Sequence, residues 1–141
     1  MIYIEEKSFN RQLELVSYLS NLEQLKICAW LYPESTVGSL AGFNVSLCES
    51  WLVAVTSYAD GFRPLHTELI PASPANISAL VNAALDLKDN CDSLALYKDN
   101  EKSWYAATIG HEGMCLVQNR SLLQGLVRAG FNASEKPPSW W

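Results

Sequence analysis

Residues 93–118, which decide the fold, read SLALYKDNEKSWYAATIGHEGMCLVQ. Three mainly apolar segments, residues 93–98, 104–109 and 114–118, are separated by the polar turn 99–102 and by the glycine-flanked turn 110–113. Short segments of this kind joined by tight turns predict three antiparallel strands that form a meander. We therefore expect an antiparallel sheet at the centre of the fold.

Helical patterns lie on both sides of the meander. Apolar residues recur at helical spacing from a Ser8 cap to about residue 21. Ser73 followed by Pro74 is a strong helix start, and the apolar pattern behind it continues to about residue 88. A final helix is expected between a cap at Asn119 or Ser121 and Gly130. These segments predict two to three helices packed against the sheet.

Further strands are predicted by alternation of apolar and polar residues outside the meander. They are expected at residues 2–5, 26–32, 43–48, 51–58 and 65–70, of which 43–48 and 51–58 can form two strands or one bent strand. The fold class is α+β, with a mainly antiparallel sheet of five to six strands. Residues 1–136 are expected to form a single domain, and residues 137–141 a C-terminal tail rich in proline and tryptophan.

The order of these elements is similar to that of profilin-like and roadblock-like folds. In both, a helix, two strands, a second helix, three strands and a last helix follow one another. The resemblance rests on element order alone, so it brings no function with it. It motivates one hypothesis, that the chain is a dimeric regulatory or structural module.

Composition narrows the class of protein. The chain has 141 residues, 49% hydrophobic and 18% charged, which is typical of a globular domain and excludes a disordered chain. A net charge of -5 repels phosphate and disfavours nucleic acid as a partner. The N-terminus lacks the pattern of a secretory signal, and no apolar run approaches the roughly 18 residues of a membrane helix. We expect a cytoplasmic protein without a membrane partner.

The four cysteines, Cys28, Cys48, Cys91 and Cys115, include no C-x-x-C pair. In a cytosolic chain this pattern predicts reduced thiols rather than a disulfide framework. A tetrahedral zinc site could combine His111, Cys115 and His66 with another cysteine, but nothing in the spacing requires one. Nucleotide-binding glycine motifs are absent from the sequence. We therefore expect no metal and no cofactor.

One nucleophilic chemistry can be drawn from the sequence. Cys115 would be the nucleophile and His111 or His66 its base. Glu68 or Glu112 would orient the imidazole. Cys115 lies within an apolar run, however, where a thiol behaves as a buried and inert residue. A small cysteine- and histidine-dependent enzyme, or a ligand-binding domain, is therefore kept as an alternative.

Acidic and aromatic residues favour a different function. Between Lys26 and Lys88 the only basic residue is Arg63, so acidic charge is concentrated in the middle of the chain. Such charge steers a basic partner, and tryptophan and tyrosine are the usual anchors of protein interfaces. The candidate protein-binding residues are Glu34, Glu49, Asp60, Glu68, Trp30, Tyr32, Trp140 and Trp141.

We therefore expect a non-enzymatic intracellular binding protein. One form is an immunity-type inhibitor that masks the basic active site of a toxin such as a nuclease. Trp30 and Tyr32 share a strand face with Lys26, which predicts that they are partly exposed to solvent. Trp140 and Trp141 can dock on their own domain, on a partner or on a second copy in a homodimer.

Overall fold

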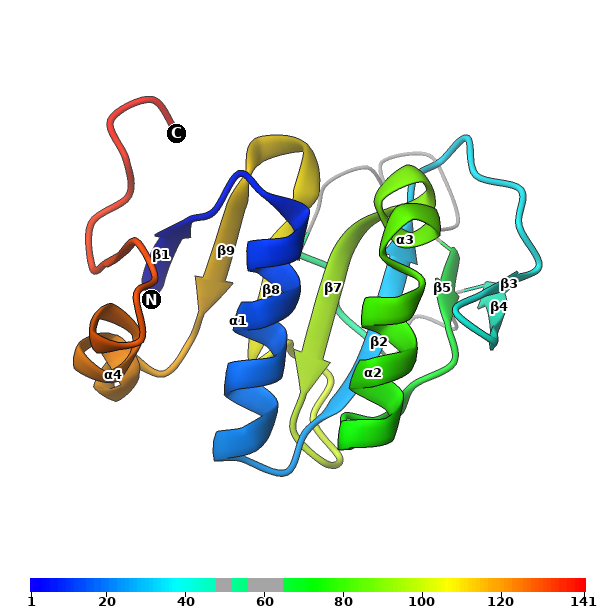
Figure 1. Cartoon of the computed structure of the whole chain (residues 1–141), viewed down its shortest axis with the longest axis horizontal. Coiled ribbons are helices and arrows are strands. Elements are labelled where there is room, and N and C mark those ends of the chain that lie inside the picture. Colours follow the sequence, from blue (N-terminus) through cyan, green and yellow to red (C-terminus); the bar gives the residue numbers. More distant parts are fainter. Residues whose placement is uncertain (48–51, 56–64) are drawn as a thin grey trace.

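The computed structural model describes residues 1–47, 52–55 and 65–141. Helices α1 (Phe9–Leu22), α2 (Pro74–Asn82) and α3 (Ala84–Asn90) lie on one face of a large sheet, and α4 (Leu123–Arg128) lies beside one of its edges (Figure 1). The described strands form one antiparallel sheet in the order β10-β1-β9-β8-β7-β2-β5-β4-β3, with β6 also paired to β2. The fold is therefore a single α+β domain, as predicted.

The strands at the centre of the sheet come from the predicted meander. β7 (Cys91–Tyr97), β8 (Ala106–Ile109) and β9 (Met114–Val117) pair in succession, and β2 (Lys26–Leu31) joins the other side of β7. The outer strands are β1 (Ile2–Glu5), β3 (Ser39–Leu40), β4 (Phe43–Leu47), β5 (Leu65–Thr67), β6 (Ile70–Pro71) and β10 (Ala133–Ser134). Every residue of β7 is buried, so the meander sits at the core of the molecule.

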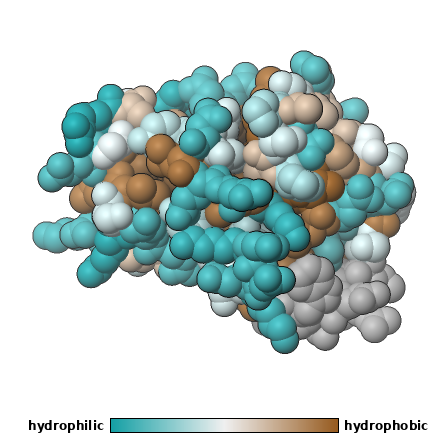
Figure 2. Space-filling model, turned by 90° about the horizontal axis from the view of Figure 1, so that it is seen from below, coloured by the Kyte–Doolittle hydropathy of each residue, from teal (hydrophilic) through white to brown (hydrophobic). Residues whose placement is uncertain are grey.

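The main core lies between the sheet and the helices. Leu13, Val16 and Leu19 of α1 are at most 3% exposed and belong to the same apolar cluster as Leu94 and Leu96 of β7. Full burial of such a side chain stabilises the fold by about 1.5–3 kcal/mol. In the view from below, hydrophilic residues run across the middle of the surface and apolar patches lie on either side (Figure 2).

The opposite face of the sheet is also covered, and this corrects the prediction for Trp30. Trp30 is only 2% exposed; its Nε1 donates to the Tyr97 hydroxyl at 3.0 Å, and its ring centroid lies 4.7 Å from that of His66. Leu52 packs into the same cluster. A sheet buried on both faces has no solvated side, so alternation along β2 does not mark exposed residues. Trp30 is a core residue and not a surface anchor.

Several predicted boundaries were also wrong. The helix expected over residues 73–88 is divided into α2 and α3 at Ala83, whose backbone leaves the helical region. Residues 52–55 form no strand, and the rest of the strand expected at 51–58 lies outside the described residues. The predicted strand 65–70 is two short strands, β5 and β6. These pieces, with the two-residue strands β3 and β10, raise the described count to ten strands and four helices.

Within the described ranges, no helix combines the length and the apolar character needed to cross a bilayer.

Candidate functional site

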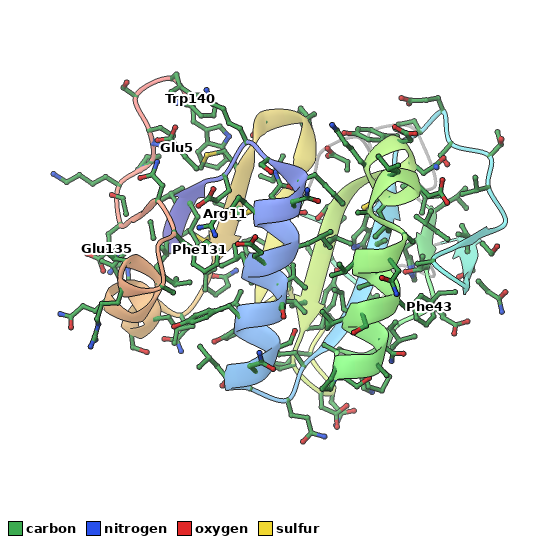
Figure 3. The ribbon with its side chains drawn as sticks, in the orientation of Figure 1. Glu5, Arg11, Phe43, Phe131, Glu135 and Trp140 are labelled. Carbon is green, nitrogen blue, oxygen red and sulfur yellow. The ribbon has the colours of Figure 1, made fainter. Side chains whose placement is uncertain are left out.

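The C-terminal tail packs against β1, which lies next to the edge strand β10 of the sheet. Trp140 Nε1 donates to Glu5 Oε2 at 3.3 Å, and Trp141 Nε1 donates to Glu112 Oε2. The ring of Trp141 meets Tyr3 edge to face, with centroids 5.5 Å apart and planes at 66°. Trp140 and Glu5 lie together near the end of the chain in Figure 3. We call these five residues the tryptophan surface.

The chain leading to the tail is fixed by backbone and cationic contacts. β10 pairs with β1, and the N–H of Glu5 donates to Asn132 O at 3.0 Å. Arg11 Nη2 donates to Gly130 O at 2.9 Å, and the Arg11 guanidinium lies 4.6 Å from the ring centroid of Phe131 (Figure 3). Gly130 has φ +92°, a conformation that suits glycine and lets the chain turn back from α4. The tail therefore starts from a fixed point.

Arg11 is itself held by two carboxylates. Its guanidinium pairs with Glu14 and, at 3.4 Å, with Glu6. The hydrogen bond with Glu14, followed by that with Glu6, raises the pKa of Arg11, so its charge is permanent. The cation that supports Phe131 is thus always present.

Both indoles of the tail are oriented but remain accessible. Trp140 is 53% exposed and Trp141 is 44% exposed, whereas Trp30 in the core is 2% exposed. Each indole has its single N–H donor bonded to a carboxylate, which limits the orientations of the ring. The tail therefore presents roughly half of each indole to solvent in a defined position.

A buried carboxylate, that of Asp92, supports the residues next to Glu112. The Asp92 side chain is 1% exposed, and its Oδ1 accepts the backbone N–H of His111 at 3.0 Å and lies 2.8 Å from His111 Nδ1. His111 Nε2 lies 3.7 Å from Glu112 Oε1. A Cβ at Gly110 would lie 2.9 Å from the backbone oxygen of Asp92, so this close approach needs glycine. Asp92 therefore orients His111, and His111 lies against the carboxylate that holds Trp141.

Two of the predicted catalytic residues, Cys115 and His66, lie far apart. Cys115 is fully buried in the main core, where burial and then the charge of Glu6 raise the pKa of its thiol. His66 is 5% exposed, and its Nδ1 lies 2.6 Å from Thr67 O. Four strand spacings separate β9 from β5, or roughly 19 Å at about 4.8 Å each. Cys115 and His66 therefore cannot form a nucleophile and base pair in this arrangement.

Cys91 does not replace Cys115 as a reactive thiol. It is also fully buried, and desolvation, with a smaller effect of the Asp92 charge, raises its pKa. A thiol in this state is protonated at neutral pH and does not act as a nucleophile. Among the described residues, no group of three His, Cys, Asp or Glu side chains could hold a metal ion.

The acidic residues expected to steer a partner are spread over the molecule. Glu34 and Glu68 are exposed, and Tyr32 is partly buried. β2 and β5 are antiparallel, with Trp30 opposite His66. Glu34 follows the end of β2 and Glu68 follows the end of β5, so these two acids lie at opposite ends of the strand pair. Glu49 and Asp60 lie outside the described residues. The described acids of this set do not form one face.

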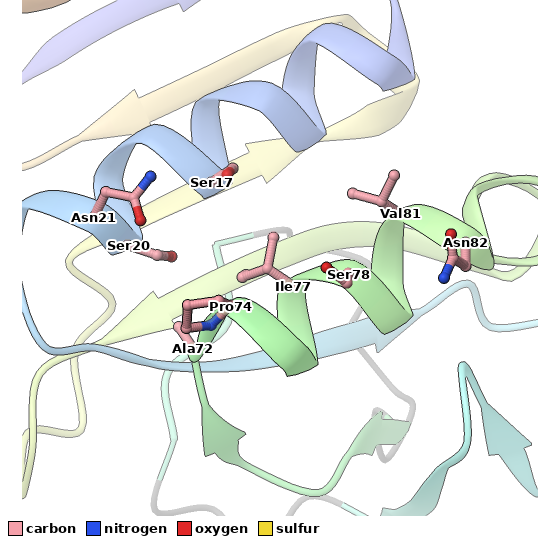
Figure 4. Close-up of a pocket in the computed structure, with 9 residues that line it drawn as sticks. All are labelled: Ser17, Ser20, Asn21, Ala72, Pro74, Ile77, Ser78, Val81 and Asn82. Atoms are coloured by element: carbon pink, nitrogen blue, oxygen red, sulfur yellow. The ribbon is translucent and has the colours of Figure 1, made fainter.

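A separate groove of about 400 Å³ runs between α1 and α2 (Figure 4). Among the described residues that line it, the polar groups are hydroxyls and amides, and none of the side chains is charged. Ser20 Oγ is already bonded to Val16 O at 2.7 Å within α1. The lining residues are Ser17, Ser20, Asn21, Ala72, Pro74, Ile77, Ser78, Val81 and Asn82.

Sequence reasoning found the two tail tryptophans but missed Tyr3, Glu5 and Asp92. Contacts between β1 and the tail join residues more than 130 positions apart, which no local pattern predicts. The one feature of the sequence that could have pointed to Asp92 was Gly110, because a glycine is needed where another backbone segment, here that of Asp92, comes very close. Comparisons of the chain with protein-family models, curated proteins and solved structures found no match.

Proposed function

We propose that the chain is a non-enzymatic binding protein that captures a basic protein partner through the tryptophan surface. The observation that carries this proposal is the state of Trp140 and Trp141. Both indoles are fixed by carboxylates, yet about half of each is exposed. Large aromatic side chains held in place beforehand bind with less loss of conformational entropy than mobile ones.

The chemistry of the surface favours an arginine-bearing partner. A guanidinium can stack on an exposed indole face, which contributes about 0.5–1 kcal/mol at an exposed site. Glu5 and Glu112 supply the negative charge beside the rings. Within the described part of the chain, no lysine or arginine forms an ion pair with either carboxylate. Arginine of the partner would therefore meet an aromatic ring and a carboxylate that no described lysine or arginine pairs with.

The pair Asp92 and His111 has a supporting part in this proposal. Asp92 fixes the ring of His111, and the ring lies beside Glu112. An imidazole oriented by a carboxylate is also typical of acid–base catalysis. No thiol of the described core is available to His111, because Cys28, Cys91 and Cys115 are all buried. We therefore assign the pair to the positioning of Glu112.

An inhibitor of the immunity-protein kind is the specific form that we propose. Such a protein masks the basic active site of a toxin, for example a nuclease, and a net charge of -5 speeds the encounter. Exposed Glu34 and Glu68 add to this long-range attraction without contacting the same surface of the partner. The chain would then act inside the cell that makes it.

Affinity capture from a lysate of the source organism, followed by mass spectrometry, tests this function. The intact chain should retain a basic protein that elutes as salt is raised. The double variant Trp140→Ala with Trp141→Ala should bind it roughly 30-fold or more weakly, as expected for central interface tryptophans. Leu85→Ala is the matched control, because Leu85 is 80% exposed on α3. Equal capture by the double variant and the intact chain would contradict the proposal.

A further inference from the structure

A second site lies at the end of the meander opposite the tryptophan surface. A cavity of about 460 Å³ opens where the turn between β7 and β8 meets the residues that follow β9. This volume lies within the usual range of small-molecule sites, about 300–1,000 Å³. Its lining includes two aromatic residues, Trp104 and Tyr105, and two amides, Gln118 and Asn119. Figure 2 views this end of the molecule, where hydrophilic residues cover the middle of the surface.

Tyr105 gives the cavity a rigid aromatic wall. It is only 6% exposed, its backbone N–H donates to Leu96 O at 2.7 Å, and its carbonyl accepts from Gln118 N at 2.9 Å. Burial raises the pKa of its hydroxyl, against the opposite effect of a hydrogen bond from Asn119. The hydroxyl also bonds to Glu23, so its contacts with Asn119 and Glu23 fix the ring in place and leave the aromatic surface as its contribution to the cavity.

The charges around the cavity compensate one another. Lys98 Nζ lies 5.0 Å from the ring centroid of Tyr105 and 3.7 Å from Glu23 Oε1. Glu101 also lines the cavity. The Lys98 ammonium group is thus already paired with Glu23 and held over the Tyr105 ring, so it is not free to bind an anion. A phosphate or carboxylate ligand would be repelled, whereas an uncharged ligand would not.

The remaining polar groups are suited to hydroxyls. Asn119 Oδ1 is occupied by Ser121, whose N and Oγ lie 3.1 and 2.7 Å away, and its amide nitrogen already donates one N–H to Tyr105. The second N–H of that amide is the donor left for the cavity. Gln118 supplies a donor and an acceptor on one exposed side chain. A hydroxyl group of a ligand needs both a donor and an acceptor beside it. Sugar rings carry several hydroxyls, and they also present an apolar C–H face to aromatic residues.

We propose that this cavity binds a neutral saccharide unit, held by Gln118, Asn119 and Glu101 against Trp104 and Tyr105. Its size admits one or two sugar rings, and its lining offers donors, acceptors and aromatic surface without net positive charge. The site is separate from the tryptophan surface, so it would add a ligand to the domain and does not depend on a protein partner.

The experiment uses the intact ¹⁵N-labelled chain, titrated in turn with glucose, galactose and N-acetylglucosamine to about 50 mM, a range that detects millimolar binding. At least one sugar should shift the indole signal of Trp104 and the side-chain amide signal of Gln118 in a saturable way. Gln118→Ala should weaken this binding roughly fivefold or more, the effect of losing one hydrogen bond. Gln124→Ala on exposed α4 is the matched control and should leave the affinity unchanged.

Two results would overturn the inference. The first is the absence of shifts at Trp104 with all three sugars. The second is a stronger response of the same signals to inorganic phosphate, which would show an anion site. Truncation of the tail leaves every lining residue in place, so sugar binding by that variant separates this inference from the proposed function.

Discussion

Truncation of the chain after Lys136 removes both indoles of the tryptophan surface, and the structure predicts how little this costs in stability. A whole tryptophan can bury about 250 Å². Because Trp140 is 53% exposed and Trp141 44% exposed, docking removes roughly 250 Å² in total from water. At about 25 cal/mol per Å², this burial stabilises the docked tail by at most about 6 kcal/mol.

The cost of ordering the tail nearly cancels that gain. Fixing the five residues 137–141 costs about 1.5 kcal/mol each, or about 7 kcal/mol in total. Hydrogen bonds from the two indoles to Glu5 and Glu112 return about 1 kcal/mol each. The net contribution is therefore about 1 kcal/mol, and truncation should lower the free energy of unfolding by less than about 2 kcal/mol.

Urea unfolding followed by far-ultraviolet circular dichroism measures this difference without relying on tryptophan fluorescence. The slope of the unfolding free energy against urea should stay nearly the same, because the core is intact. A loss above about 4 kcal/mol would refute the reasoning, since the tail would then be a structural part of the core. A small loss would show that the core does not need the docked indoles for its stability.

Three other perturbations test the framework that carries the site. Phe131→Ala, at a residue only 6% exposed, should lower the free energy of unfolding by about 3–5 kcal/mol in the same urea assay. Gly110→Ala places a Cβ 2.9 Å from a backbone oxygen and should cost about 1–3 kcal/mol, whereas Gly38→Ala, with no atom within 4 Å, is the control and should change little. Burial raises the thiol pKa of Cys91 and Cys115, so above the unfolded thiol pKa of about 8.5 only the unfolded chain loses these protons. The stability that these two buried thiols contribute is thus fully present below about pH 8.5. Above that pH it falls by up to about 1.4 kcal/mol per pH unit for each thiol. An unchanged urea midpoint in reducing buffer between about pH 7.5 and 9.5 would contradict this.

The central part of the fold could be predicted because its pairing is local. The strands β7, β8 and β9 are joined by short turns, so alternation of apolar residues between turn residues was enough to predict the meander. Helix α1 followed from the spacing of its leucines, since one face is buried against the sheet. In both cases the residues that set the pattern lie close to one another in the sequence.

Other features depended on distant parts of the chain. Trp30 looked partly exposed because its strand also carries Lys26, but Leu52 and Tyr97 cover that face of the sheet. The helix break at Ala83 has no proline or glycine to mark it. Docking of the tail on its own domain could be named as one option and not chosen, because a proline-rich end has no periodicity that fixes its position. The contact of Trp141 with Tyr3 was not predicted.

Nuclear magnetic resonance can show whether the tryptophan surface is a preformed site for a basic group. The indole N–H signals of Trp140 and Trp141 would be followed while the intact chain is titrated with a tetra-arginine peptide. Both signals should shift in a saturable way, with a Kd of about 1 mM. A tetra-glutamate peptide should leave them in place. Indole signals that do not respond to arginine, or that respond equally to both peptides, would contradict the account.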